Sequence, residues 1–125
     1  MPAGSGDGAY RYAFESVVKP AIDKFQPEFI FIASGFDASY YDPLSRMAVH
    51  AYTFNWMANQ VLEMADKYAK GRVVTTHEGG YSEVYVPFCG LAVLEAFLGK
   101  SSGIIDIMAT GSDAATRKDQ QLLAH

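Results

Sequence analysis

The first third of the chain combines a helical pattern of apolar residues with a strand-like one. In residues 9–25 the apolar positions recur every three or four residues, which predicts a helix with one buried face. Pro20 lies inside this stretch and has no backbone N–H, so we expect it to kink the helix or to end its regular region a turn early. Gln26-Pro27 should stop the helix, and an aromatic and β-branched run then predicts a strand from about Glu28.

A second helix and a second strand follow. Asp42-Pro43 is typical of a helix start, because Asp caps exposed amides and Pro suits the first turn. We therefore predict a long helix from this point to about Lys70, ended by Gly71, and a strand over residues 72–77. The apolar face of this helix has helical spacing and consists of Met47, Ala51, Phe54, Ala58, Val61, Leu62, Ala65 and Tyr68.

The last third predicts a third helix over residues 83–98, ended by Gly99. Its Pro87 falls in the first turns, where proline is tolerated. Residues 100–111 look irregular, and Ser112-Asp113 predicts the start of a short final helix that runs through Leu123.

The order helix, strand, helix, strand, helix predicts the α/β class with a parallel sheet. Two strands make a small sheet, and parallel sheets need helices on both faces. We therefore expect residues 1–125 to be a portion of a larger α/β domain.

Composition narrows the partners and the compartment. A net charge of -4 argues against direct binding to nucleic acid or to an anionic membrane, both of which need clustered Lys and Arg. A single cysteine, Cys89, cannot form an internal disulfide, and the start of the chain does not resemble a secretory signal. The apolar runs are far shorter than the ~18 residues that would span a bilayer. We predict a cytoplasmic protein in a reducing environment, with no membrane partner.

Polar side chains follow both predicted strands. Asp37 comes just after the first strand, and Tyr81 comes after Glu78-Gly79-Gly80 at the end of the second. In open α/β sheets, ligands bind beyond the carboxyl ends of the strands, so these two residues are candidates for a site. Each also has an ordinary explanation, since Asp often stabilises turns and Tyr often packs with its hydroxyl at the surface.

The three histidines do not predict a metal site. His50 is expected inside the long helix as a polar residue beside the core, His77 ends the second strand, and His125 is terminal. His77-Glu78 is not followed by the second histidine of an H-E-x-x-H motif.

The spaced set of motifs resembles the histone deacetylase family, including its bacterial deacetylase-like and acetylpolyamine amidohydrolase members. The matching residues are Ser34-Gly35-Phe36-Asp37-Ala38, Asp42-Pro43-Leu44 and Glu78-Gly79-Gly80-Tyr81, and the opening residues 4–10 also look like the family. The resemblance covers roughly residues 2–99 and implies a three-layer arginase/deacetylase-like fold with a parallel sheet.

This resemblance implies roles for five residues. In the family, two aspartates and a histidine hold a zinc ion, and Asp37 matches the second aspartate. Tyr81 matches the catalytic tyrosine, whose hydroxyl stabilises the oxyanion formed when zinc-activated water attacks an acetyl amide. Leu44, Gly79 and Gly80 match positions that shape the substrate tunnel. The implied cofactor is zinc, and the implied substrate is acetyl-lysine or an acetylated amine.

The chain also departs from the family. It has no His-His pair and no Asp-x-His segment, which in the family move protons and supply the other two zinc ligands. We therefore expect residues 1–125 to be the carboxyl-terminal portion of a deacetylase domain without its amino-terminal portion, inactive alone, with Met1 an internal methionine of a longer reading frame. The alternative is a truncated, non-catalytic α/β remnant or interaction module, whose sheet is completed by a partner chain.

Overall fold

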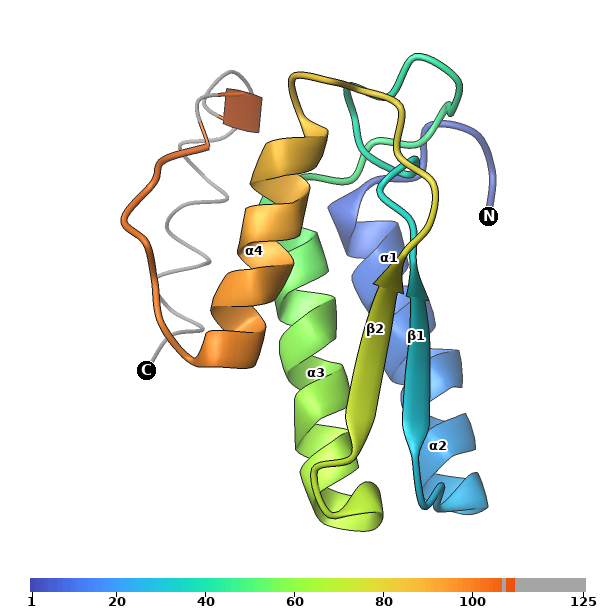
Figure 1. The fold of residues 1–125 in the computed structure, drawn as a ribbon. Coiled ribbons are helices and arrows are strands. Elements are labelled where there is room, and N and C mark those ends of the chain that lie inside the picture. The colour runs from blue at the N-terminus through green and yellow to red at the C-terminus, as the bar shows by residue number, and fades with distance from the viewer. Residues whose placement is uncertain (107, 110–125) are drawn as a thin grey trace.

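A computed structural model describes residues 1–106, 108 and 109 of the chain. These residues form three helical regions separated by two short strands, in the order that the sequence predicts (Figure 1). The predicted helix that begins at Ser112-Asp113 lies outside the described residues. The elements are α1 Asp7–Ala13, the π-helix η1 Phe14–Val18, α2 Lys19–Phe25, β1 Ile30–Ser34, α3 Ala51–Ala69, β2 Val73–His77 and α4 Val86–Leu98.

The first helical region continues through Pro20 with one wide turn. α1, η1 and α2 follow one another without a gap, and in the π-helix the Lys19 N–H donates to the Phe14 carbonyl. Because Pro20 has no N–H to donate, the carbonyl one turn before it loses its usual partner, and a π turn is one way to accommodate that loss. The predicted disturbance at Pro20 therefore takes the form of a wide turn, and the helix ends at Phe25 as predicted.

The strands β1 and β2 pair in parallel, with Ile30 opposite Val73 and Ser34 opposite His77. The helix α3 connects them, as a parallel pair requires. Both strands therefore end at the same edge of the sheet, and the loops that follow them leave side by side (Figure 1). β1 begins two residues later than the predicted start at Glu28.

The predicted helix start at Asp42-Pro43 is wrong, because α3 begins at Ala51 with His50 as its N-cap. The carboxylate of Asp42 instead accepts hydrogen bonds from the turn at Leu44 and Ser45 and from the loop after β2, at Tyr81. The segment after this turn is extended, since the Tyr40 N–H donates to the Val49 carbonyl and the Ala48 N–H donates to the Ser5 carbonyl. Backbone pairing with two other segments therefore replaces the first two predicted turns. The same correction moves His50 from the helix interior to its N-cap.

Two apolar clusters form the core of the described residues. The larger one joins α3 to α4 and to the loop after β1, where the Phe36 and Phe54 rings meet edge to face at 5.3 Å. The smaller one packs Phe14, Val61 and Met64 against the inner sides of the strands. Most of the predicted α3 face is buried, including Ala51, Phe54, Ala58, Val61 and Ala65.

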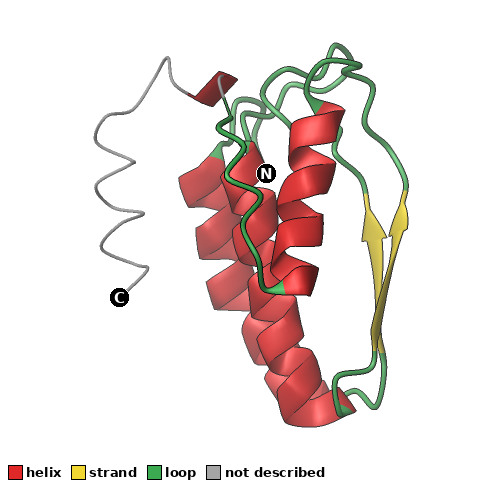
Figure 2. Ribbon diagram, turned by 60° about the vertical axis from the view of Figure 1, so that its left-hand side comes forward, coloured by secondary structure: helices red, strands yellow, loops and turns green. Residues whose placement is uncertain are grey.

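The described helices cover only one face of the sheet. Figure 2 shows the helices on one side of the two strands and nothing described on the other. On the uncovered face, the paired residues Phe31 and Val74 are 59% and 46% exposed. Within the described part of the chain, no helix is long and apolar enough to cross a membrane.

Candidate site at the carboxyl ends of the strands

The loops after β1 and β2 stay paired beyond the last ladder residues. The Glu78 N–H donates to the Ser34 carbonyl at 2.9 Å, and the Phe36 N–H donates to the Gly79 carbonyl at 2.7 Å. This continued pairing carries the backbone at Gly79 close to the side chain of Asp37. Two residues that the sequence places at separate strand ends therefore meet in space.

The Asp37 carboxylate lies between two glycines. A Cβ atom built on Gly79 would lie 2.8 Å from Asp37 Oδ2, and one built on Gly35 would lie 3.0 Å from Asp37 Oδ1. Both distances are shorter than ordinary van der Waals contact, so only glycine allows the carboxylate this position without a shift. In the described part of the chain, this half-buried carboxylate has no hydrogen-bond or ion-pair partner.

Tyr10, on α1, is a neighbour of Asp37 that sequence reasoning does not single out. Burial raises the pKa of the Tyr10 hydroxyl, and the negative charge of Asp37 raises it further. Tyr10 also packs against the larger apolar cluster. Its only signal in the sequence is its place in the opening segment, residues 4–10, that resembles the deacetylase family.

Asp42 joins the two loops of the site. Its Oδ1 accepts hydrogen bonds from the backbone N–H groups of Leu44 at 2.9 Å and Ser45 at 3.0 Å. Its Oδ2 accepts one from the Tyr81 N–H at 2.8 Å. Burial alone would raise the pKa of Asp42, but these three donors outweigh it and lower the pKa. One buried carboxylate thus fixes the backbone of two predicted site residues.

The side chains of Leu44 and Tyr81 themselves are open to solvent, at 72% and 55% exposed. Gly80 precedes Tyr81 with a φ of 128°, and a Cβ there would lie 3.0 Å from Val86 Cγ2 and 3.1 Å from Phe36 Cβ. Glycine at position 80 is therefore required by its backbone conformation and by its packing. The structure brings Asp37 to Gly79, and it brings the backbones of Leu44 and Tyr81 to Asp42.

The described residues do not provide a complete metal site. Among residues 1–106, 108 and 109, no three His, Cys, Asp or Glu side chains are grouped so that they could hold a metal ion. The His77 ring packs against Phe36, with 5.2 Å between ring centroids. Catalytic zinc takes three protein ligands and a water, so Asp37 fits one position of such a set and the other two have no counterpart here.

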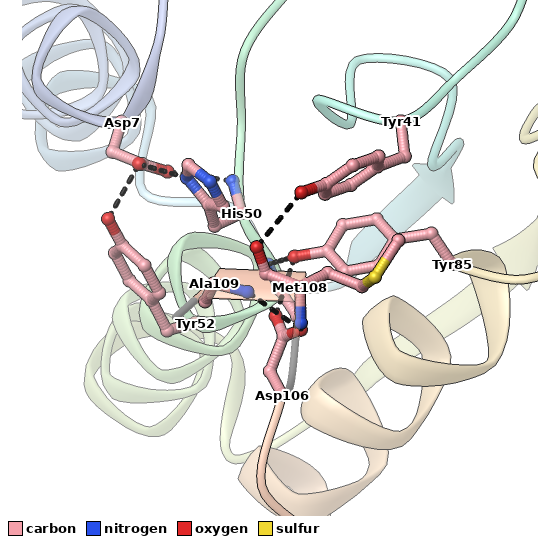
Figure 3. A network of polar contacts seen from close by, with 9 residues as sticks. Asp7, Tyr41, His50, Tyr52, Tyr85, Asp106, Met108 and Ala109 are labelled. Carbon is pink, nitrogen blue, oxygen red and sulfur yellow. Dashed lines mark hydrogen bonds and ion pairs between the residues drawn. The ribbon is translucent and has the colours of Figure 1, made fainter. Parts of the chain in front are cut away.

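A second polar cluster lies where α1 meets the start of α3 (Figure 3). Asp7 accepts hydrogen bonds from the His50 backbone at 2.9 Å and from the Tyr52 hydroxyl at 2.6 Å, and its Oδ2 lies 2.8 Å from His50 Nδ1. The His50 ring stacks between the rings of Tyr40 and Tyr52, each centroid 5.6 Å away. Sequence reasoning missed this cluster, because Asp7 is more than 40 residues away from His50 and Tyr52.

Tyr85 anchors the other side of the start of α3. It is fully buried, accepts a hydrogen bond from the Ala51 N–H at 3.0 Å and donates one to Asp106 at 2.6 Å (Figure 3). Burial and this carboxylate raise the pKa of Tyr85. Tyr85 is therefore a structural tyrosine, unlike the exposed Tyr81.

The spacing of a serine-nucleophile motif, G-x-S-x-G, also occurs at residues 99–103. In enzymes this motif joins a strand to a helix. Here it follows the end of α4, and the Ser101 Oγ accepts a hydrogen bond from the Gly103 N–H at 3.2 Å. The motif therefore forms a loop after a helix and does not form a nucleophile elbow.

Comparison with known proteins identifies the family. Residues 1–97 match the family model of the histone deacetylase domain. The chain is 50% identical over 103 residues to a histone deacetylase-like amidohydrolase of Pseudomonas aeruginosa, and 34% identical over 100 residues to a probable deacetylase of Archaeoglobus fulgidus. These matches cover 82% and 79% of this chain but only 27% and 28% of the relatives.

Solved structures agree with the sequence matches. The histone deacetylase Clr3 aligns with 84% of this chain at a TM-score of 0.72 and 32% identity, and the match covers 17% of that protein. The HD domain of HDA15 aligns with 79% of the chain at a TM-score of 0.70 and 32% identity, and the match covers 27% of that chain. The fold is thus that of an arginase/deacetylase-like α/β domain, and the chain belongs to the histone deacetylase family. The resemblance and the fold class predicted from the sequence are confirmed.

Proposed function

We propose that residues 1–125 are the carboxyl-terminal portion of a zinc-dependent deacetylase domain that hydrolyses N-acetyl amides and releases acetate. The substrate class is acetyl-lysine or an acetylated amine. The observation that carries this proposal is the Asp37 carboxylate, which has no partner in the described residues and lies at the carboxyl ends of the strands between Gly35 and Gly79. A carboxylate that only stabilised a turn would bond nearby backbone amides, as Asp42 does.

Asp37 is the proposed zinc ligand, and Tyr81 is the proposed catalytic residue. Bound zinc would polarise the acetyl carbonyl and lower the pKa of its water. The Tyr81 hydroxyl would donate a hydrogen bond to the acetyl oxygen as negative charge develops there. The exposure of the Tyr81 side chain supports this role, since its hydroxyl is free to meet a substrate.

Leu44, Gly79 and Gly80 are the proposed substrate-binding residues. The exposed Leu44 side chain offers an apolar wall for the alkyl chain of a lysine. Gly79 and Gly80 leave backbone without side chains beside Tyr81, so a narrow alkyl chain could approach closely.

The chain alone is expected to be inactive, because Asp37 is one donor where catalytic zinc needs three. The remaining ligands and the proton-transferring histidines would come from an amino-terminal portion, either in the same polypeptide or in a partner chain. The open face of the sheet at Phe31 and Val74 supports such a completing segment, since parallel sheets are normally covered on both faces.

A non-catalytic interaction module is the second candidate, and the same open sheet favours it. Exposed strand edges recruit other chains, so the two strands could pair with a partner that has no deacetylase site. In that case Asp37 would have no metal to bind, in any assembly.

A chimera separates the two candidates. This chain would replace the matching segment of the Pseudomonas aeruginosa relative, whose own activity on an acetyl-lysine peptide serves as the reference. We expect the chimera to bind zinc and release acetate, and we expect Asp37→Asn to lose both. A chimera that folds but does not bind zinc would favour the interaction module. Micromolar or tighter zinc binding by the 125-residue chain alone would contradict the incomplete site.

A further inference from the structure

Asp42 is the one described side chain that bonds both loops of the site. It is buried, at 8% exposed, and both of its carboxylate oxygens are used. Oδ1 holds the turn at Leu44 and Ser45, within its own loop. Oδ2 reaches the Tyr81 N–H, 39 residues further along the chain.

The bond to Tyr81 matters because little else fixes this residue. Its side chain is 55% exposed, so packing restrains it weakly. Gly79 and Gly80 before it are held by Phe36, but within the described residues no other hydrogen bond reaches Tyr81 itself. The hydrogen bond at the Tyr81 N–H is therefore the contact that fixes the position of the Tyr81 backbone, from which its side chain extends.

We propose that Asp42 is a positioning residue, whose carboxylate holds the Tyr81 backbone at a fixed place relative to the Leu44 turn. This role rests on the proposed function, in which Tyr81 donates to the substrate and Leu44 lines its tunnel. Asp42 itself need not touch the substrate, because it acts through the backbone of both residues.

The carboxylate is suited to this task by its two equivalent acceptors. Asparagine has one carbonyl oxygen and one NH₂ group, so it cannot accept on both sides. Because the Leu44 turn offers two N–H donors and Tyr81 offers one, the carbonyl oxygen should face the turn and leave the Tyr81 N–H without an acceptor. Serine can cap the turn, but its side chain is too short to reach the second loop as well. Asp42→Asn and Asp42→Ser therefore remove the link between the loops by two different routes.

The first test uses the 125-residue chain and needs no activity. Hydrogen exchange followed by NMR should show the Tyr81 amide exchanging roughly tenfold faster or more in Asp42→Asn and in Asp42→Ser, which is the effect expected from losing one bond to a charged acceptor. Amides of the β1 and β2 ladder should keep their exchange rates. Asp66→Asn, an exposed aspartate on α3, is the control of equal charge and should leave Tyr81 unchanged. Unchanged Tyr81 exchange in whichever Asp42 variant folds would overturn the proposal.

The second test uses the chimera and separates positioning from a general structural role. Asp42→Asn should lower kcat about tenfold or more while zinc affinity stays within twofold, since the misplaced group is Tyr81 and not Asp37. In a Tyr81→Phe background the same substitution should have little further effect on kcat, because the hydroxyl that Asp42 positions is gone. Equal losses in both backgrounds would overturn the positioning role.

The two proposals fail in different ways. If the chimera binds no zinc and is inactive, the proposed function fails, and faster Tyr81 exchange would then mark Asp42 as a structural link only. If the chimera is active but Asp42→Asn keeps full kcat, the positioning role fails and the deacetylase function stands.

Discussion

Asp7 and His50 tie the start of α1 to the start of α3 through two contacts. Asp7 Oδ2 lies 2.8 Å from His50 Nδ1, and Asp7 Oδ1 accepts the His50 N–H at 2.9 Å. Burial alone would raise the pKa of Asp7, but the hydrogen bonds from His50 and Tyr52 outweigh it and lower the pKa from 3.8 to about 2. The ionised form of Asp7 is therefore the one that stabilises the fold.

The first prediction follows from the sign of this shift. A pKa that is lower in the folded state gives a stabilisation that is complete above pH 3.8 and is lost as the pH falls toward 2. Allowing for the solvent near this pair, Asp7→Asn should lower the free energy of unfolding by about 1–2 kcal/mol at pH 7. Urea unfolding at several pH values should show this difference shrink between pH 4 and pH 2. A difference that stayed constant over that range would contradict the assignment to Asp7.

The second prediction concerns the contact between Gly79 and Asp37. In Gly79→Ala the new Cβ would lie 2.8 Å from Asp37 Oδ2, so the carboxylate must move. In the chimera we expect zinc affinity to fall by about tenfold or more, because metal sites tolerate little displacement of a ligand. Gly8→Ala is the matched control, since a Cβ there meets nothing within 4 Å. Isothermal titration with zinc measures the affinity of both variants, and equal zinc affinity in Gly79→Ala and Gly8→Ala would remove Asp37 from the site.

The third prediction concerns the buried hydroxyl of Tyr85. Tyr85→Phe leaves the Ala51 N–H at the start of α3 without its acceptor and the Oδ2 atom of Asp106 without its donor. An unsatisfied buried group costs about 1–3 kcal/mol, so the free energy of unfolding should fall by that amount. Tyr12→Phe is the control, because Tyr12 is 73% exposed and should change stability by less than about 0.5 kcal/mol. Urea unfolding of both variants is the measurement, and similar values would contradict the role of Tyr85.

The fourth prediction concerns Cys89. The residue is fully buried on α4, and burial, together with the charge of Asp106, raises the pKa of its thiol to about 12. Since the thiolate is the reactive form, the native chain should not react with a thiol reagent at pH 8 over an hour, while the chain in denaturant should react with one equivalent. The absorbance of the chromophore that the reagent releases measures the reaction of the native chain and of the denatured chain. Rapid reaction of the native chain would show that this region of α4 opens readily.

The sequence predicts those features of the fold that depend on neighbours along the chain. The apolar spacing finds α3 and α4, and the positions of Gly71 and Gly99 mark their ends closely. The apolar run before Ser34-Gly35 finds β1, and the spaced motifs identify the family. The signals for these helices and for β1 lie within a few residues of the features that they predict.

Features that depend on distant residues could not be predicted in this way. Asp42 looks like a helix cap because Pro43 follows it, yet its bond to the Tyr81 N–H is decided by a loop 39 residues away. Asp7 gives no local sign that it will meet His50 and Tyr52. The nearness of Asp37 to Gly79 follows only once the parallel register of β1 and β2 is known.

The last prediction uses the open face of the sheet to test whether the domain is incomplete. Phe31 is 59% exposed and pairs with Val74 on this face, whereas Ile32 points inward and packs on the smaller apolar cluster. In the isolated chain, Phe31→Lys should reduce self-association and the binding of a hydrophobic dye, because a charge on an exposed strand discourages edge and face contacts. Its free energy of unfolding should change by less than about 0.5 kcal/mol, since little apolar area is lost.

The same substitution should act in the opposite direction in the chimera. There the amino-terminal portion is expected to cover Phe31, so a lysine would be buried and the chimera should be destabilised by several kcal/mol. Ile32→Thr is the control, because it faces the described core and should destabilise both proteins alike. Sedimentation of the isolated chain and thermal unfolding of the chimera provide the two measurements. If Phe31→Lys left the chimera as stable as its parent, the face would be open in the longer protein as well, and it would then be a surface for a separate partner.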